Sequence, residues 1–500
     1  MKKSTTTTPK RSRSPETERK SAPFKKKGTS RCKFSGRCGG CTMIDTPMEE
    51  QLRAKQLLLE ECIGEFGPVE PVIRMKNPGR YRNKVTSIFG LDRKGRPVCG
   101  VYRQHSHEIV PVTDCLIENK RAGVIVQTIY SMLPSFKIRV YDEKTGFGLL
   151  RAVQIRTART TGQIMVTIVT NGPAFPSKNH FVQALLQKHP EITTIVQNIN
   201  SRATTMVLGT TEKIIYGPGY IEDELCGKRF RISSRAFYQV NSLQTDKLYR
   251  IAIDCAGLSG KERVIDTYCG IGTIGICAAD KAAEVIGVEL NPDAVKNAVM
   301  NAGLNGLQNV RFYNDDSGSF MEDLARKNET ADVVFMDPPR SGASDEFLQS
   351  LLVLSPKKIV YVSCNPVTLG ENLAVLVDAG YRMKKAVPVD MFPFTEGIET
   401  VCLLSKLSEA KHHISVQVDM DELDLTSAEA KATYKEIQDW VQEKYGFHVT
   451  NLNIAQVKQK HGIIERENYN KPKTPDSKQP GCPEDKIKAI EDAMRNFQMI

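Results

Sequence analysis

The chain has 500 residues and a formal net charge of +11; it shows no secretory signal at its start and no apolar run long enough to cross a membrane. This length suggests roughly three domains, and the apolar and charged fractions are ordinary for a globular protein. Thirteen cysteines without a secretory signal argue against a disulfide framework. We therefore expect a cytoplasmic protein that uses some cysteines in a metal site or in catalysis, and the positive charge favours a polyanionic partner.

Much of that charge lies at the start of the chain. Residues 1–31 carry eleven Lys or Arg against Glu16 and Glu18, with almost no apolar residues. Such a segment cannot bury enough surface to offset the entropy of ordering, so we expect a disordered basic tail. It could bind phosphates without regard to sequence or act as a solubilising tail, and its composition favours neither.

A short cysteine-rich loop follows the tail. Three cysteines fall within ten residues, between glycines that let the backbone wrap closely, and one more lies far along the chain. Zinc sites usually pair their cysteines in two short knuckles, whereas three clustered cysteines with a remote fourth are nearer to the iron–sulfur pattern. We therefore favour a [4Fe–4S] cluster over zinc, in a segment covering residues 32–75 that also holds an amphipathic helix from Met48 to Cys62. The four candidate ligands are Cys32, Cys38, Cys41 and Cys115.

Residues 76–231 are predicted to form a β-rich central domain. Tyr81–Phe89 alternates polar and apolar residues, and Ile164–Thr170 is a further strand. Arginines and lysines scattered through these strands would suit a sheet that faces RNA, although such charges are more often a solvated surface. We expect this domain to bind RNA.

From residue 232 to 408 strands and helices alternate. Strands are predicted at Val264–Asp266, Ala283–Glu289, Ala331–Asp337 and Ile359–Val362. This order predicts an α/β domain with a doubly wound, parallel, Rossmann-like sheet. Residues 409–500 look like a small helical appendage of unknown role.

The first loop of this domain carries a glycine motif. Gly270, Gly272 and Gly275 match the fingerprint of dinucleotide-binding loops, and Glu289 ends the next strand, where an acid would contact ribose hydroxyls. The same unit also binds S-adenosylmethionine (SAM). A strand that ends in Asp337-Pro-Pro-Arg suits a loop that holds a planar base beside a methyl donor, and this favours SAM.

A cysteine is predicted at the end of another strand. Pro366 stops the strand that leads into Cys364, so this cysteine lies at the sheet edge where ligands bind. A lone cysteine is more often structural, but a thiolate here could attack C6 of uracil and activate C5 to take a methyl group. A base must then remove the C5 proton; Glu399, before the last predicted strand, is the candidate, and Glu396 is its competitor.

With these motifs together, the chain resembles the RNA 5-methyluridine methyltransferase family, and within it the iron–sulfur branch that acts on 23S ribosomal RNA. The resemblance implies a SAM-dependent methyltransferase fold, with Cys364 as nucleophile and Glu399 as base. It also implies SAM contacts and ligands of a [4Fe–4S] cluster. The matching stretches are Cys32–Cys41 with Cys115, Tyr81–Val85, Ser233–Asn241, Asp266–Gly272, Asp337–Gly342, Ser363–Leu369 and Met391–Glu399; the implied SAM contacts are Gln239, Tyr268, Glu289 and Asp337, and the implied cluster ligands are Cys32, Cys38, Cys41 and Cys115.

The expected activity is SAM-dependent methylation of uridine C5 in RNA, most simply 23S rRNA, at an unstacked nucleotide. No membrane and no obligate protein partner are expected. Many members of this family carry a small β-barrel before the cluster, and the 31 residues before Cys32 are too few for it. The sequence therefore does not indicate which part of the chain holds the RNA. The alternatives are a tRNA uracil-C5 methyltransferase, a cytosine-C5 methyltransferase, a nicotinamide-dependent oxidoreductase and a non-catalytic iron–sulfur RNA-binding protein.

Overall fold

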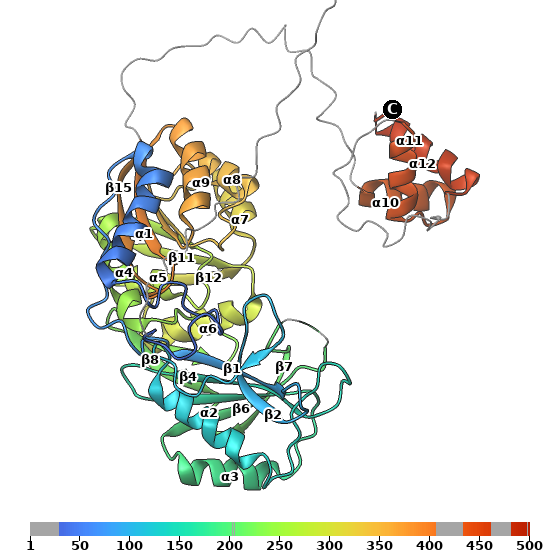
Figure 1. Cartoon of the computed structure of the whole chain (residues 1–500). Helices are drawn as coiled ribbons and strands as arrows, with labels where there is room; N and C mark the ends of the chain where they lie inside the picture. Colours follow the sequence, from blue (N-terminus) through green and yellow to red (C-terminus); the bar gives the residue numbers. More distant parts are fainter. Residues whose placement is uncertain (1–29, 203, 205, 407–433, 462–481, 498) are drawn as a thin grey trace, which may run out of the picture. The chain divides into compact units, whose positions relative to one another are not determined.

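The computed structural model describes residues 30–497 except 203, 205, 407–433 and 462–481, and also residues 499–500. The chain divides into two compact units, Met1–Glu409 and Ala410–Ile500, and each is described by itself (Figure 1). Nearly all of the predicted basic tail and parts of the predicted helical appendage lie outside the described residues. No helix in the described ranges combines the length and the apolar character that crossing a membrane requires.

The first unit contains the predicted α/β sheet. Its first five strands run parallel, as the alternation of strands and helices predicts, and consecutive strands are joined by crossover helices. The sheet is not wholly parallel, because one strand runs against its two neighbours. In spatial order the strands are β12 (Val310–Asn314), β11 (Glu284–Glu289), β10 (Arg263–Thr267), β13 (Val333–Met336), β14 (Lys358–Ser363), β16 (Glu399–Lys406) and β15 (Tyr381–Val389).

The antiparallel strand β16 corrects the prediction of a parallel sheet. It is last in sequence, but it lies between β14 and β15 and is antiparallel to both. The loop between β15 and β16 covers only residues 390–398, too short for a crossover helix, so the chain must return antiparallel. This insertion brings the first residue of β16, Glu399, beside the end of β14.

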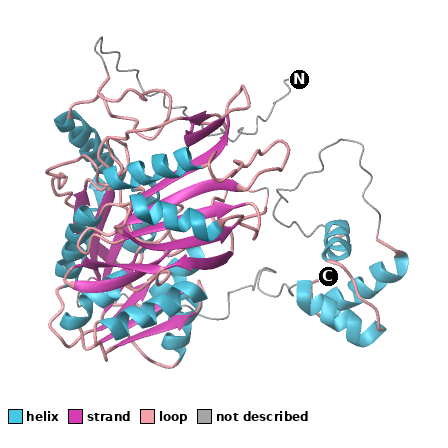
Figure 2. Cartoon of the chain, turned by 90° about the horizontal axis from the view of Figure 1, so that it is seen from below, coloured by secondary structure: helices cyan, strands magenta, loops and turns pink. Residues whose placement is uncertain are grey.

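Helices cover both faces of this sheet (Figures 1 and 2). Alternate residues of a strand point to opposite faces, so Val264 packs in one hydrophobic cluster and Ile265 in another. The cluster around Val264 includes residues of α4 (Ser242–Ala256), α5 (Thr273–Ala278) and α6 (Pro292–Leu304). The cluster around Ile265 includes residues of α1 (Met48–Ile63), α7 (Ser317–Arg326), α8 (Asp345–Leu354) and α9 (Pro366–Asp378).

A second seven-stranded sheet forms the central part of the unit. Two helices, α2 (Lys120–Met132) and α3 (Lys178–Lys188), pack in its hydrophobic core. The predicted β-rich domain therefore contains two helices that the sequence patterns do not predict. The strand order is β3 (Ile109–Val110), β2 (Pro97–Tyr102), β1 (Lys84–Leu91), β4 (Leu150–Thr157), β5 (Ile164–Thr170), β6 (Ile192–Ile199) and β7 (Thr211–Tyr216).

Two further segments of this unit pack on the α/β sheet. The hairpin of β8 (Tyr220–Leu225) and β9 (Lys228–Ser233) buries its apolar side chains in the cluster around Val264. The chain between α1 and β1 runs along the edge strand β15, where Val69 and Ile73 form parallel bridges with Ala386 and Val389. The amino-terminal segment is therefore held against the α/β domain, although it lies far away in sequence.

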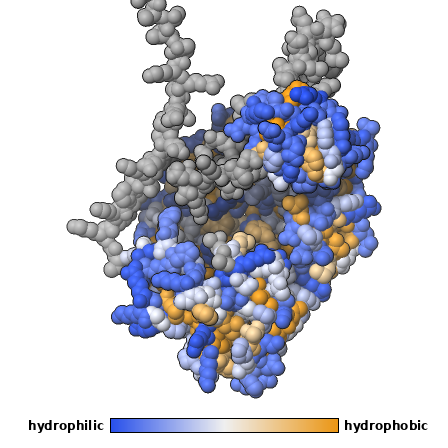
Figure 3. Space-filling view, turned by 90° about the vertical axis from the view of Figure 1, so that its right-hand side faces the viewer, coloured by the Kyte–Doolittle hydropathy of each residue, from blue (hydrophilic) through white to orange (hydrophobic). Residues whose placement is uncertain are grey.

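The second unit contains three described helices around a small apolar core, α10 (Tyr434–Tyr445), α11 (Asn451–Lys460) and α12 (Glu484–Asn496). Thr450 caps α11 with a reciprocal hydrogen bond to Asn453. These helices agree with the predicted helical appendage. Over the surface seen in Figure 3, hydrophobic patches are interspersed with hydrophilic residues.

Candidate active site

A cavity of about 440 Å³ lies at the carboxyl ends of β10, β13 and β14, the edge at which ligands bind in open α/β sheets. The loops that follow these three strands form much of its wall. Five of the six side chains predicted for catalysis and SAM binding line it, and Glu289 does not. The five are Cys364, Glu399, Gln239, Tyr268 and Asp337.

Cys364 occupies a sharp turn between a strand and a helix. Strand β14 ends at Ser363, and the side chain of Asn365 caps α9 by accepting a hydrogen bond from the amide of Val367 (3.2 Å). The Asn365 side chain also donates to the carbonyl of Arg340 (3.0 Å), which ties this turn to the Asp337–Arg340 loop. The thiol is therefore held half-buried at the cavity wall, between two loops of the sheet edge.

Glu399 lies across from that cysteine. Ser363 pairs with Thr400 in the antiparallel register of β14 and β16, so the next residues, Cys364 and Glu399, stand at the same level of the sheet. Glu399 is only 3 % exposed, and its Oε2 has no hydrogen-bond partner within the described structure. Burial, then the charge of Asp337, raises the pKa of Glu399 well above its ordinary value, against the opposing charge of Arg340. The competing candidate, Glu396, is exposed and does not line the cavity.

Two carboxylates accept hydrogen bonds from backbone amides in and near the glycine loop. Glu289 accepts hydrogen bonds from the amides of Gly270 (3.0 Å) and Asn291 (2.8 Å), and Asp266 accepts one from Gly275 (2.8 Å). In dinucleotide-binding loops such amides face a pyrophosphate. Here two of them are already used by carboxylates, and the nearby negative charge favours a cationic ligand. The Asp337-Pro-Pro-Arg loop, which favours SAM over a nicotinamide cofactor, lines the same cavity as this glycine loop.

Two residues of this wall are strained or electrostatically perturbed. Tyr268 has a φ of 57°, a left-handed conformation that is unusual for a tyrosine, and such strain concentrates at functional sites. Its ring packs against Phe347 with centroids 5.0 Å apart. Burial raises the pKa of Asp337 to about 7, so its carboxyl is poised between its two charge states near neutral pH. Gln239 does not cap the following helix, because Asn241 does.

Three residues that lined no predicted site complete the cavity. The Arg340 side chain hydrogen-bonds to Cys364, and its charge lowers the pKa of that thiol, whereas burial and then the charges of Glu399 and Asp337 raise it. Arg82 and Phe237 line the cavity from outside the α/β sheet, and Phe237 is 66 % exposed. Arg340 belongs to the same four-residue loop as Asp337, so the sequence alone could have indicated it as a site residue. Arg82 and Phe237 lie in two further stretches that match the family, Tyr81–Val85 and Ser233–Asn241, but neither is among the predicted site residues.

Buried polar side chains hold the loop before Glu399. Lys55 of α1 forms an ion pair with Asp390 (Nζ to Oδ1, 2.6 Å) and donates to the carbonyl of Phe392. Gln51 of the same helix accepts a hydrogen bond from the amide of Phe394 (2.9 Å). Phe392 lines the cavity, whereas Phe394 is buried in a small core. Of these two rings, only Phe392 is placed to contact a base in the cavity.

The four predicted ligand cysteines come together in the fold. Cys32, Cys41 and Cys115 pack against the small core that contains Phe394. Burial, and then the charges of Cys115, Cys38 and Cys32, raise the pKa of Cys41 to about 12. Within the described ranges, no group of three or more His, Cys, Asp or Glu side chains is arranged to hold a metal ion. The proximity of the four cysteines does not by itself show a [4Fe–4S] cluster, which stays a prediction from the sequence.

Comparison with known proteins agrees with this geometry. Residues 193–407 match the family described as tRNA (Uracil-5-)-methyltransferase. An uncharacterized RNA methyltransferase of Listeria innocua is 42% identical over 75% of this chain and 83% of its own length. A similar protein of Caldanaerobacter subterraneus is 42% identical over 75% of this chain and 84% of its own length.

A solved structure shows the same fold with a product of SAM bound. The tRNA (uracil-54, C5)-methyltransferase of Pyrococcus abyssi, in complex with S-adenosyl-L-homocysteine, matches with a TM-score of 0.62 and 26% identity. The match covers 73% of this chain and 86% of the archaeal one. Together with the carboxylate-lined glycine loop, these likenesses identify the cofactor as SAM and the substrate as RNA. The chain therefore belongs to the RNA (uracil-5-)-methyltransferase family, a family of methyl-transferring enzymes.

Proposed function

We propose that this enzyme methylates C5 of a uridine in 23S ribosomal RNA through a covalent bond between Cys364 and C6 of the base. The observation that carries the proposal is that a half-buried thiol and a buried, unpartnered carboxyl oxygen line one cavity beside the glycine loop. Uracil C5 is too weak a nucleophile to take a methyl group unaided. A thiolate and a base on the same cavity wall supply what the reaction lacks.

In the proposed reaction, the thiolate of Cys364 adds to C6, and the electron pair of the C5–C6 double bond moves to C5. C5 then takes the methyl group, for which bound SAM supplies an electrophilic carbon and leaves as S-adenosylhomocysteine. Glu399 removes the proton from C5, the double bond forms again, and the bond between Cys364 and C6 breaks. The products are 5-methyluridine and the free thiolate, while the proton stays on Glu399.

Arg340 is proposed to stabilise the thiolate. Burial and two neighbouring carboxyls raise the pKa of Cys364, and the hydrogen bond and charge of Arg340 act against them. A cation beside the sulfur favours the ionised form that attacks. The raised pKa of Glu399 suits a general base that must pick up a proton inside a buried site.

We also propose which residues contact SAM and which residues hold the cluster. Tyr268, Gln239 and Asp337 line the cavity and are proposed to contact SAM, while Glu289 is proposed to act by holding the amide of Gly270. Cys32, Cys38, Cys41 and Cys115 are proposed to hold a [4Fe–4S] cluster. Because Met43 donates to the carbonyl of Phe394 (2.9 Å), the cluster would stabilise the loop that leads to Glu399.

A second candidate substrate is tRNA. The solved relative from Pyrococcus abyssi acts on tRNA, and this favours a tRNA uridine as the alternative target. The proposal of 23S rRNA rests on the set of four cysteines, which resembles the iron–sulfur branch. In either RNA the uridine must leave its stack to reach Cys364, and Phe237 and Phe392 are placed to stack on it.

The proposal is tested by trapping the covalent adduct. Wild-type protein, SAM and 5-fluorouridine-substituted ribosomal RNA are run on a denaturing gel beside Cys364→Ala. Fluorine at C5 cannot leave as a proton, so the enzyme stalls with the RNA attached. We expect a shifted band in the wild type and none in Cys364→Ala, and nuclease digestion of the adduct locates the target uridine.

The same assay separates the alternatives. An adduct with tRNA and none with ribosomal RNA would keep the mechanism and change the substrate. If neither RNA formed an adduct although SAM binding was intact, the assignment of Cys364 as nucleophile would be wrong.

A further inference from the structure

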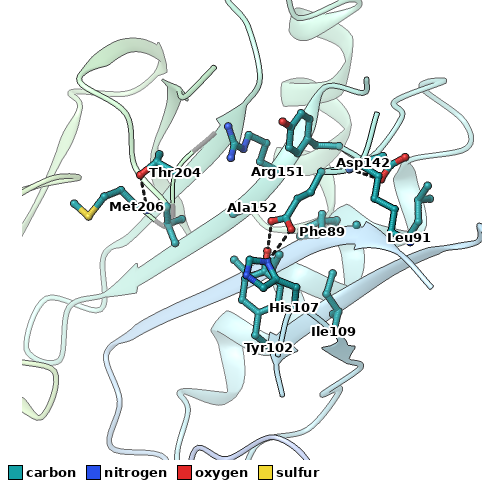
Figure 4. A pocket seen from close by; sticks show the side chains of 16 residues that line it. Phe89, Leu91, Tyr102, His107, Ile109, Asp142, Arg151, Ala152, Thr204 and Met206 are labelled. Atoms are coloured by element: carbon teal, nitrogen blue, oxygen red, sulfur yellow. Dashed lines mark hydrogen bonds and ion pairs between the residues drawn. The ribbon is translucent and has the colours of Figure 1, made fainter. Parts of the chain in front are cut away.

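A second cavity, of about 520 Å³, lies in the central sheet and contains none of the predicted catalytic or cofactor residues. Strands β1, β2, β3 and β4, the loop of residues 141–144 and the side chains of Thr204, Met206 and Val207 enclose it. Figure 4 shows Tyr102 and His107 together on one side of this pocket, with Thr204 and Met206 on another. Its wall combines aromatic, cationic and apolar groups.

The aromatic groups of this pocket are fixed in place. Glu143 accepts a hydrogen bond from the hydroxyl of Tyr102 (2.7 Å), and its other oxygen lies 2.8 Å from Nδ1 of His107. The guanidinium of Arg151 lies over the ring of Tyr141, 4.4 Å from its centroid, and donates to the carbonyl of Asn200 (2.6 Å). Flat aromatic and guanidinium groups held in this way are the surfaces on which unstacked bases bind.

Part of the pocket wall lies on the same face of the central sheet as Lys84. Side chains at alternate positions of a strand point to the same face, so Ile88 and Gly90 at the pocket share the face of Lys84. Arg82, two residues before Lys84, lines the catalytic cavity. At about 3.3 Å per residue, the six steps from Arg82 to Ile88 span roughly 20 Å.

Positive charge lies between the two cavities on this face. Lys84 pairs across the strands with Arg156, which is 2 % exposed and whose Nε and Nη1 have no hydrogen-bond partner in the described structure. Burial, and then the charges of Arg156 and Arg82, lower the pKa of Lys84 to about 8. Lys84 and Arg82 are half-buried, so a passing anion such as a phosphate of a nucleic-acid strand would offset the repulsion between them, to which the buried Arg156 adds its charge from within.

We propose that this pocket, defined by Tyr102, His107, Tyr141 and Arg151, binds a second unstacked base of the RNA strand that carries the target uridine. The inference rests on the proposed function, because it needs an RNA substrate in the catalytic cavity. The backbone between the two bases would pass over Lys84. At roughly 3.4 Å per stacked nucleotide the span holds about six nucleotides, and fewer if the strand is extended. We take single-stranded RNA as the occupant because the stacking groups of the pocket and the methylation site lie on either side of Lys84 and Arg82.

The test compares two single-stranded oligoribonucleotides cut from the RNA region that forms the adduct. The short one has two nucleotides on each side of the target uridine, and the long one has ten. Steady-state methylation is measured for wild type, Tyr102→Ala, His107→Ala, Tyr102→Phe and Phe147→Ala. Phe147→Ala is the matched control, because this aromatic side chain is 79 % exposed next to the same loop but does not line the pocket.

We expect the two alanine variants at the pocket to raise KM for the long RNA by roughly 5- to 100-fold at unchanged kcat, and to leave the short RNA unaffected. Tyr102→Phe keeps the ring and Phe147→Ala leaves the pocket intact, so both should stay within about twofold of wild type. A 4-thiouridine placed within six nucleotides of the target should crosslink to a peptide containing Tyr102 or Tyr141 in the wild type.

Three results would overturn the inference. Normal adduct formation with the same KM for both RNAs in every variant would show that the pocket holds no base, while the proposed function would stand. An equal loss on the short and long RNAs would point to a general folding defect. If no RNA formed an adduct or bound the protein, the proposed function and this inference would fail together.

Discussion

The ion pair between Lys55 and Asp390 offers a test of how the catalytic loop is held. Both side chains are at most 2 % exposed, and their charged atoms lie 2.6 Å apart. Replacing Lys55 with Met leaves the carboxyl of Asp390 buried without its cation, a change that costs about 3–5 kcal/mol in comparable pairs. For a unit of roughly 380 residues with an unfolding entropy of about 2.1 cal/mol/K per residue, this corresponds to a fall in Tm of about 4–6 °C.

The pH dependence identifies the cause of that loss. Burial already raises the pKa of Asp390 despite the opposing charge of Lys55, and without Lys55 the pKa rises further. A carboxyl whose folded pKa is raised destabilises the fold when it is ionised, so Lys55→Met should lose more stability at pH 8 than at pH 5.5. In Asp390→Asn the remaining charge is Lys55, whose pKa burial already lowers and which loses the carboxylate that raises it, so this variant should lose more stability at pH 5.5 than at pH 8.

The assay is differential scanning calorimetry of the full chain, with Arg74→Ala as control. Arg74 pairs with Glu49 at the surface, with 58% and 76% of the two side chains exposed, so its removal should move Tm little. The double variant Lys55→Met/Asp390→Leu removes both charges and should recover most of the stability. A fall in Tm below about 1 °C for Lys55→Met, equal at both pH values, would refute the reasoning.

Three further predictions concern the active site and the cysteine loop. Glu399→Gln should lower kcat by roughly 10²- to 10⁴-fold and accumulate a methylated adduct with ordinary RNA, because proton removal follows methylation; a fall in activity without an adduct on a denaturing gel would contradict this order. Arg340→Gln removes the cation that lowers the pKa of Cys364. Its adduct formation should therefore be slower at pH 7.5 and partly recover by pH 9.5, and a loss that is equal at both pH values would exclude this role. Cys41→Ser should lose iron and acid-labile sulfide, and hydrogen exchange should increase at the amide of Met43, which donates to the carbonyl of Phe394. An iron content equal to that of wild type would exclude Cys41 as a ligand.

Local patterns were enough to locate much of the α/β domain. Strand β5 has the predicted ends, and β14 extends its predicted core by one residue at each end, because runs of β-branched residues bounded by turn residues describe buried strands well. Helix α2 was missed although Ile125, Ile129 and Met132 recur at helical spacing on its buried face. The strand patterns on both sides of this segment led to the whole region being predicted as β-rich.

The motifs also carried most of the site, because three loops at one sheet edge must meet wherever parallel strands lie side by side. The sequence by itself therefore determined the five parallel strands, the glycine loop and the position of Cys364 at a strand end. Only the tertiary structure decided that β16 enters between β14 and β15, which buries Glu399 beside Cys364 and leaves Glu396 outside. The same holds for Arg82 and for the pocket around Tyr102, since contacts between separate domains depend on packing and leave no periodic signal in the chain.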